Sequence, residues 1–145
     1  MRLLVPLDLS AATPAVLAAV RGIAAREATQ VFLLHVAEPD PDFVGYEAGS
    51  DAVRDQVAHE YRDQHRELQA HADALRADGI TATALLIRGP TAQTILREAQ
   101  RLPADLLVMA THGHGAVFDL LVGSVSHAVL RGTTVPLLLV PVRSR

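Results

Sequence analysis

Five short apolar runs recur along the chain, and they constrain its fold more than any other feature of the sequence. Leu, Val, Ile and Ala dominate these runs, and polar or turn-forming residues follow each of them. Such runs are typical of parallel strands covered on both faces, because a strand with one face in water alternates apolar and polar residues. The runs are Arg2 to Leu7, Val31 to Val36, Ile80 to Ile87, Leu106 to Met109 and Val135 to Val142. We therefore expect five strands, of which the one over Ile80 to Ile87 has one end less covered, because threonine alternates with apolar residues there.

Amphipathic stretches separate the apolar runs. Their apolar residues return at spacings of three and four, the period of a helix with one buried face. The stretches cover residues 13–29, 52–78, 91–102 and 125–131. Strands that alternate with helices form βαβ units, whose right-handed crossovers favour an open parallel sheet. We expect one α/β domain over residues 1–145, Rossmann-like, with a doubly wound five-stranded sheet in the order 3-2-1-4-5. Its four helices should cover both faces.

Two prolines interrupt the last apolar run. Pro136 and Pro141 lack the N–H group that a sheet ladder needs, so this strand is expected at an edge of the sheet. One interpretation is that the prolines simply protect that edge from pairing. We favour a homodimer joined through Val135 to Val142, because an exposed Leu-Leu-Leu-Val edge would be an aggregation hazard.

The composition excludes several classes of function. The chain has no cysteine, which excludes a disulfide framework, a thiolate zinc site and a cysteine nucleophile. It also has no lysine, so any phosphate must be bound by backbone groups, hydroxyls, arginine or a metal. The net charge of −3 provides no positive electrostatic field to attract nucleic acid, so we expect no nucleic-acid partner. No apolar run approaches the roughly 20 residues of a membrane span, and no signal peptide precedes the first strand, so we expect a cytoplasmic protein with no membrane partner.

A ligand site is expected where the strand order reverses. In doubly wound sheets ligands bind beyond the carboxyl ends of the strands at this switch point, which here lies between the first and fourth strands. Pro6, Leu7 and Asp8 would lie on one side of it, and Met109 to Gly113 on the other. Small and polar residues interrupt the apolar runs at both places, which favours a small-molecule site.

Several familiar motifs are incomplete. Gly113-His114-Gly115 begins like a dinucleotide fingerprint, but Phe118 occupies the position of the third glycine, so NAD is not expected. Ser126 and His127 are neighbours on a predicted helix, and their side chains cannot face each other as a nucleophile and its base must. Serine hydrolase chemistry therefore has no support.

Some polar residues allow two interpretations. Asp8 could cap the first helix or accept a hydrogen bond from a ligand, and Ser124 could be the N-cap of the last helix or bind a phosphate. His35, in an apolar strand, is expected to be satisfied by a backbone carbonyl rather than to act as a base. His112 and His114 could share a metal, but no third ligand is near in sequence, and both can equally be loop residues near a phosphate.

The chain resembles the universal stress protein family over essentially its whole length. The resemblance rests on LLVPLDLS, VFLLHV, the turn Arg88-Gly89-Pro90-Thr91, VMATHGHGAVFDLLVGSVSHAVL and VPLLLVPV. The family's nucleotide-binding signature is glycine, two residues, glycine, nine residues, then glycine and serine or threonine. Gly113 and Gly123-Ser124 match it, and Ala110 replaces the first glycine.

The resemblance implies an ATP site, with magnesium or manganese as a counter-ion for the phosphates. The residues implied are Pro6, Leu7, Asp8 and the backbone of Val36 at the adenosine end, Met109, Ala110 and Gly113 at the ribose and first phosphate, and Gly123, Ser124, Val125 and Ser126 at the outer phosphates.

The function implied is that of an ATP-binding, homodimeric stress-response regulator. One alternative is a dimeric regulator of the same fold that binds no nucleotide. Another is a slow ATPase or phosphotransferase, for which Asp119 is the nearby carboxylate, although a solvated loop acid explains this residue equally. Ala110 bears on the first alternative: an alanine costs roughly 1–2 kcal/mol if the position needs positive φ, and little if glycine only permits close approach.

Overall fold

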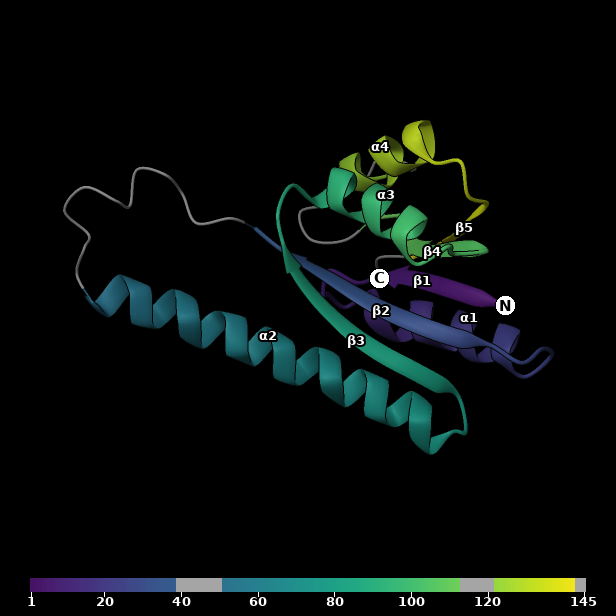
Figure 1. Ribbon diagram of the computed structural model, residues 1–145, viewed down its shortest axis with the longest axis horizontal. Coiled ribbons are helices and arrows are strands. Elements are labelled where there is room, and N and C mark those ends of the chain that lie inside the picture. The colour runs from purple at the N-terminus through teal and green to yellow at the C-terminus, as the bar shows by residue number, and fades with distance from the viewer. Residues whose placement is uncertain (39–50, 113–121, 143–145) are drawn as a thin grey trace.

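Five parallel strands form one sheet, and helices lie on both sides of it (Figure 1). The computed structural model describes residues 1–38, 51–112 and 122–142. The sheet has the order β3-β2-β1-β4-β5. Its strands are β1 (Arg2–Pro6), β2 (Gln30–Ala37), β3 (Thr81–Arg88), β4 (Leu106–Ala110) and β5 (Leu137–Val140). The predicted order is confirmed, with β3 and β5 at the edges.

Four helices cover the two faces of the sheet. They are α1 (Thr13–Ala24), α2 (Asp51–Ala77), α3 (Thr91–Arg101) and α4 (Ser124–Gly132). Helices α1 and α2 lie on one side of the sheet, and α3 and α4 lie together on the other (Figure 1). In the part of the chain that the structure describes, no helix is both long and apolar enough to cross a bilayer.

Side chains of the central strands alternate between two hydrophobic clusters. Leu3 and Val5 of β1 pack with α1 and α2, whereas Leu4 packs with α3 and α4. In β2, Leu33 joins the first cluster and Leu34 the second. Because successive side chains point to opposite faces, a strand covered on both sides needs apolar residues at every position. This explains the unbroken apolar runs of the sequence.

The ends of the last strand differ from the prediction. The ladder residues of β5 run only from Leu137 to Val140, rather than over the whole of 135–142. Pro136 and Pro141 flank the strand directly, and neither has an N–H group to extend the ladder. The edge position itself is confirmed, because β5 pairs only with β4 in the sheet.

Truncation of a central leucine should test this two-sided core. Leu33 is fully buried, so we expect Leu33→Ala to lower the free energy of unfolding by about 2–5 kcal/mol. The matched control is Leu130→Ala on α4, where 49% of the residue is exposed and the loss should be about 0.5 kcal/mol or less. Urea unfolding followed by circular dichroism measures both, and equal losses would contradict the assignment of the core.

Candidate functional site

The carboxyl ends of β1 and β4 lie next to each other, at the carboxyl end of the sheet. The two strands pair in parallel, with Leu3 opposite Leu106 and Leu4 opposite Leu107. From β1 the sheet continues to β2 and β3 in one direction, and to β4 and β5 in the other. The switch point is therefore the place between the carboxyl ends of β1 and β4. The structure thus brings the predicted residues at the ends of both strands, Leu7 and Met109 among them, to the switch point.

A short network joins the end of β4 to the start of α4. The Gly123 amide donates to the Thr111 carbonyl at 2.7 Å, and the Thr111 amide donates to the Val140 carbonyl at 3.0 Å. One turn into α4, the Ser126 hydroxyl donates to the Ala110 carbonyl at 2.9 Å. These bonds hold the first turn of α4 against the carboxyl end of β4. Thr111 has no conspicuous signal in the sequence, and its role was not predicted.

The first turn of α4 leaves three backbone amides without an acceptor in the helix. The first intrahelical bond runs from the His127 amide to the Gly123 carbonyl, at 2.9 Å. The amides of Ser124, Val125 and Ser126 therefore precede the helical ladder, and no side chain caps them among the described residues. Such amides, together with the helix dipole, are suited to bind an anion.

The two serines of this turn differ in exposure and in hydrogen bonding. Of the two interpretations of Ser124, the N-cap is wrong, because the N-cap is Gly123 and Ser124 is the first helical residue, with an exposed side chain. Its role toward a phosphate stays a prediction. The Ser126 residue is only 5% exposed, and its hydroxyl proton is used by the Ala110 carbonyl. Each serine can therefore offer a ligand its amide, and only Ser124 also offers an exposed hydroxyl.

Ala110 occupies its position without backbone strain. Among the described residues, Leu9 is the only non-glycine residue with positive φ, at 59°. Ala110 is the last residue of β4 and therefore has an extended conformation that any residue adopts. The structure gives no conformational reason for glycine at this position, so the methyl group of alanine carries no strain penalty.

The turn after β1 leads the chain into α1. An Asp8 carboxylate oxygen accepts from the Ser10 amide at 3.1 Å, and the Ser10 hydroxyl accepts from the Ala12 amide at 3.2 Å. The N-cap position of α1 is Ala12, without a side-chain cap. The interpretation of Asp8 as the cap of α1 is therefore wrong, and its role toward a ligand stays a prediction.

His35 lies beneath this turn. Its residue is 8% exposed, and its Nδ1 atom lies 2.7 Å from the Leu7 carbonyl oxygen. The prediction that a backbone carbonyl satisfies this histidine is confirmed. Val36, expected at the adenosine end, is also buried and follows on the opposite face of β2.

Some of the predicted residues lie outside the described part of the chain. These are Gly113, His114 and Asp119, so the second glycine of the signature, the histidine pair and the loop carboxylate have no structural account. Within residues 1–38, 51–112 and 122–142, no three carboxylate, histidine or cysteine side chains are grouped as a metal site would require.

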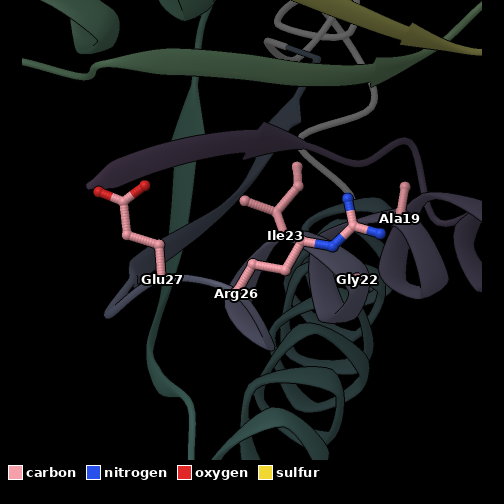
Figure 2. A pocket seen from close by; sticks show the side chains of 5 residues that line it. All are labelled: Ala19, Gly22, Ile23, Arg26 and Glu27. Atoms are coloured by element: carbon pink, nitrogen blue, oxygen red, sulfur yellow. The ribbon is translucent and has the colours of Figure 1, made fainter.

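A surface hollow lies along α1, away from the switch point, and its volume is about 440 Å³. Figure 2 shows the side chains that line it. Its lining is Ala19, Gly22, Ile23, Arg26 and Glu27. Its volume suits a small ligand, but the only charged groups, on Arg26 and Glu27, belong to exposed residues. No buried polar group converges on this hollow, so it does not compete with the switch point as a binding site.

Comparison with known proteins gives one consistent family. The model of the universal stress protein family matches residues 1–141 of this chain. A curated relative from Thermus aquaticus, described as the universal stress protein in the QAH/OAS sulfhydrylase 3' region, is 35% identical over 112 residues, which are 77% of each protein.

Solved structures share the fold at lower sequence identity. The structure of the protein MJ0577 has a TM-score of 0.83 and 22% identity, and the match covers 99% of this chain and 97% of that one. A universal stress protein family member from Arabidopsis thaliana with AMP bound gives 0.71 and 15%, over 99% and 93%. A universal stress protein in complex with cAMP gives 0.67 and 20%, over 97% and 96%. At these identities the likeness shows the fold alone.

Replacement of the two serines of α4 should separate their roles. Ser126→Ala removes the only hydroxyl that reaches the Ala110 carbonyl among the described residues, so we expect a loss of about 1 kcal/mol in unfolding free energy. Ser124→Ala alters an exposed side chain and should change it by about 0.5 kcal/mol or less. Urea denaturation measures both, and a larger loss for Ser124→Ala would contradict the network described above.

Proposed function

Because this chain belongs to the universal stress protein family, we propose that it is a homodimeric stress-response regulator that binds ATP at the switch point of its sheet. The observation that carries this proposal is the first turn of α4. The three amides of Ser124, Val125 and Ser126 have no helical acceptor, and they stand beside the carboxyl end of β4. A phosphate group is the ligand that such a turn favours.

The adenosine end of the ligand is proposed to lie over β1 and β2. Asp8 follows β1 at the switch point, and the polypeptide backbone of Val36 lies near the carboxyl end of β2. Pro6 and Leu7 are buried beneath them and offer an apolar floor. The AMP-bound and cAMP-bound relatives support an adenine nucleotide as the class of ligand.

The phosphates are proposed to extend from Met109 and Ala110 toward Gly123 and the start of α4. Thr111 joins these two segments through the Gly123 amide, so a single ligand could span them. The chain has no lysine to balance the phosphate charge. A divalent ion bound with the nucleotide, magnesium or manganese, would supply that charge, since hard cations prefer phosphate oxygens.

Dimerisation is proposed to use the edge strand β5. Leu138 is 39% exposed in the middle of this strand, and β5 has a neighbouring strand on one side only. An apolar edge with unpaired backbone groups is stabilised when a second copy covers it. The protective effect of the flanking prolines limits pairing along the strand, so side-chain contacts between the two copies would contribute most.

Nucleotide binding can be tested directly. We expect purified protein, when denatured, to release an adenine nucleotide, and the emptied protein to bind ATP more tightly with magnesium than without it. Nucleotide analysis of the supernatant and calorimetric titration measure these outcomes. The absence of released nucleotide, together with no binding at ATP concentrations on the order of millimolar, would refute the proposal.

Gly123→Val tests whether ATP binds at the start of α4. A Cβ atom at residue 123 would lie 3.2 Å from the His112 Cβ and 3.3 Å from its Cα, so a valine must displace the segment that leads to α4. We expect this variant to fold but to lose ATP binding. Gly22→Val is the control, because a Cβ there meets nothing within 4 Å and binding should be unchanged. Equal affinities for the two variants would place the ligand elsewhere.

The dimer interface can be tested by a charge on the edge strand. Leu138→Asp should convert the dimer to a monomer, because burial of an unpaired carboxylate opposes association. Leu130→Asp places the same charge on α4 at a more exposed leucine and should leave the dimer intact. Sedimentation velocity distinguishes the species. A wild-type monomer, or dissociation caused only by Leu130→Asp, would contradict the proposed interface.

A further inference from the structure

The hydrogen-bond ladder between β1 and β2 ends at Leu7 in an unusual way. The Leu7 amide donates to the Leu34 carbonyl at 2.8 Å, as a continued parallel ladder requires. The Leu7 carbonyl, however, lies 2.7 Å from the Nδ1 atom of the His35 imidazole. The last carbonyl of the ladder thus bonds to the His35 side chain instead of a backbone amide.

The register identifies the backbone group that the imidazole replaces. In a parallel pair, a residue that donates to position 34 of its neighbour normally accepts from the amide of position 36. The β1–β2 register ends at the pair Pro6 and Leu34, and among the described residues no bond from the Val36 amide to the Leu7 carbonyl extends it. Ala37 faces the other way, because its carbonyl accepts from the Gly89 amide of the β3 side. The Val36 amide is therefore directed toward the β1 side, beyond the last ladder bond.

The protonation of His35 follows from its partner. A carbonyl oxygen can only accept, so the short contact requires a proton on Nδ1. His35 is buried, with 8% of the residue exposed, so bulk water has little access to this bond. The contact is therefore a fixed restraint on the Leu7 peptide group.

The chain beyond Leu7 needs such a restraint. Leu9 has φ of 59°, a conformation that non-glycine residues rarely adopt and that persists where the surroundings hold it. Between the two residues stands Asp8, which closes the turn through the Ser10 amide. The orientation of Asp8 thus depends on a strained turn whose first peptide is held by His35.

We infer that His35 is a positioning residue for the base of the nucleotide. It holds the Leu7 carbonyl and so orients Asp8, and it ends the β1–β2 ladder so that the Val36 amide is left for the ligand. This inference rests on the proposed nucleotide function. In this inference His35 does not contact the ligand, because it acts through Asp8 and the Val36 amide.

Three variants test the inference. His35→Asn keeps an N–H donor at the position of Nδ1, His35→Gln moves the donor to the position of Nε2, and His35→Phe keeps a ring without any donor. Two measurements are made on each: ATP affinity by calorimetry, and amide hydrogen exchange of Ser10, Ala12 and Thr13 in ligand-free protein. These three amides close the turn through Asp8 and Ser10, so their exchange reports its order without any nucleotide.

We expect His35→Asn to bind ATP within a few-fold of wild type, and His35→Phe and His35→Gln to bind about tenfold or more weakly, since a buried carbonyl loses its donor. The same two variants should exchange the turn amides faster than wild type and His35→Asn, with unchanged circular dichroism. Wild-type affinity in His35→Phe would overturn the inference and leave the proposed function intact.

The two proposals fail in distinguishable ways. If wild type binds no nucleotide, the proposed function fails, and the exchange data alone decide on His35. Slow exchange of the turn amides in His35→Phe would then overturn the hold of His35 on the turn, whereas fast exchange restored by His35→Asn would support that hold. Equal loss of affinity in His35→Asn and His35→Phe would also overturn the inference, because it would show a requirement for the imidazole itself rather than for the Nδ1 donor.

Discussion

The burial of β1 is the constraint on which the rest of the structure depends. This strand pairs with β2 on one side and β4 on the other, and Leu3 to Val5 are fully buried between the two helical layers. The strand ends at Pro6, opposite Leu34, while β2 continues to Ala37. The chain leaves the core there, at the switch point between β1 and β4.

The candidate site is made largely of backbone groups held in place by a few side chains. Ser126 and Thr111 join α4 to β4, and His35 holds the end of β1. The proposed phosphate site uses backbone amides, which a chain without lysine can still supply. The alanine at position 110, in extended conformation, is compatible with that proposal.

Sequence reasoning succeeded where a pattern has a single physical cause. Continuous apolar runs predicted parallel strands, and the prolines of the last run predicted an edge. It failed at the ends of elements: Ser124 is one residue inside α4, and Asp8 does not cap α1. Serine and aspartate are favoured at caps, turns and ligand sites alike, so only the local backbone decides among these roles.

The sequence by itself determined the α/β class and the two-sided core, because burial and helical periodicity follow from the order of apolar and polar residues. The strand order followed from the common arrangement of doubly wound sheets, and the family followed from its motifs. The tertiary structure decided which groups meet. The role of Thr111 and the bond of the Ser126 hydroxyl depend on neighbours that are distant in sequence. The positive φ of Leu9 could not be predicted, because leucine rarely adopts this conformation. His35 shows both: its burial was readable from its strand, but its hold on Leu7 required the register of β1 against β2.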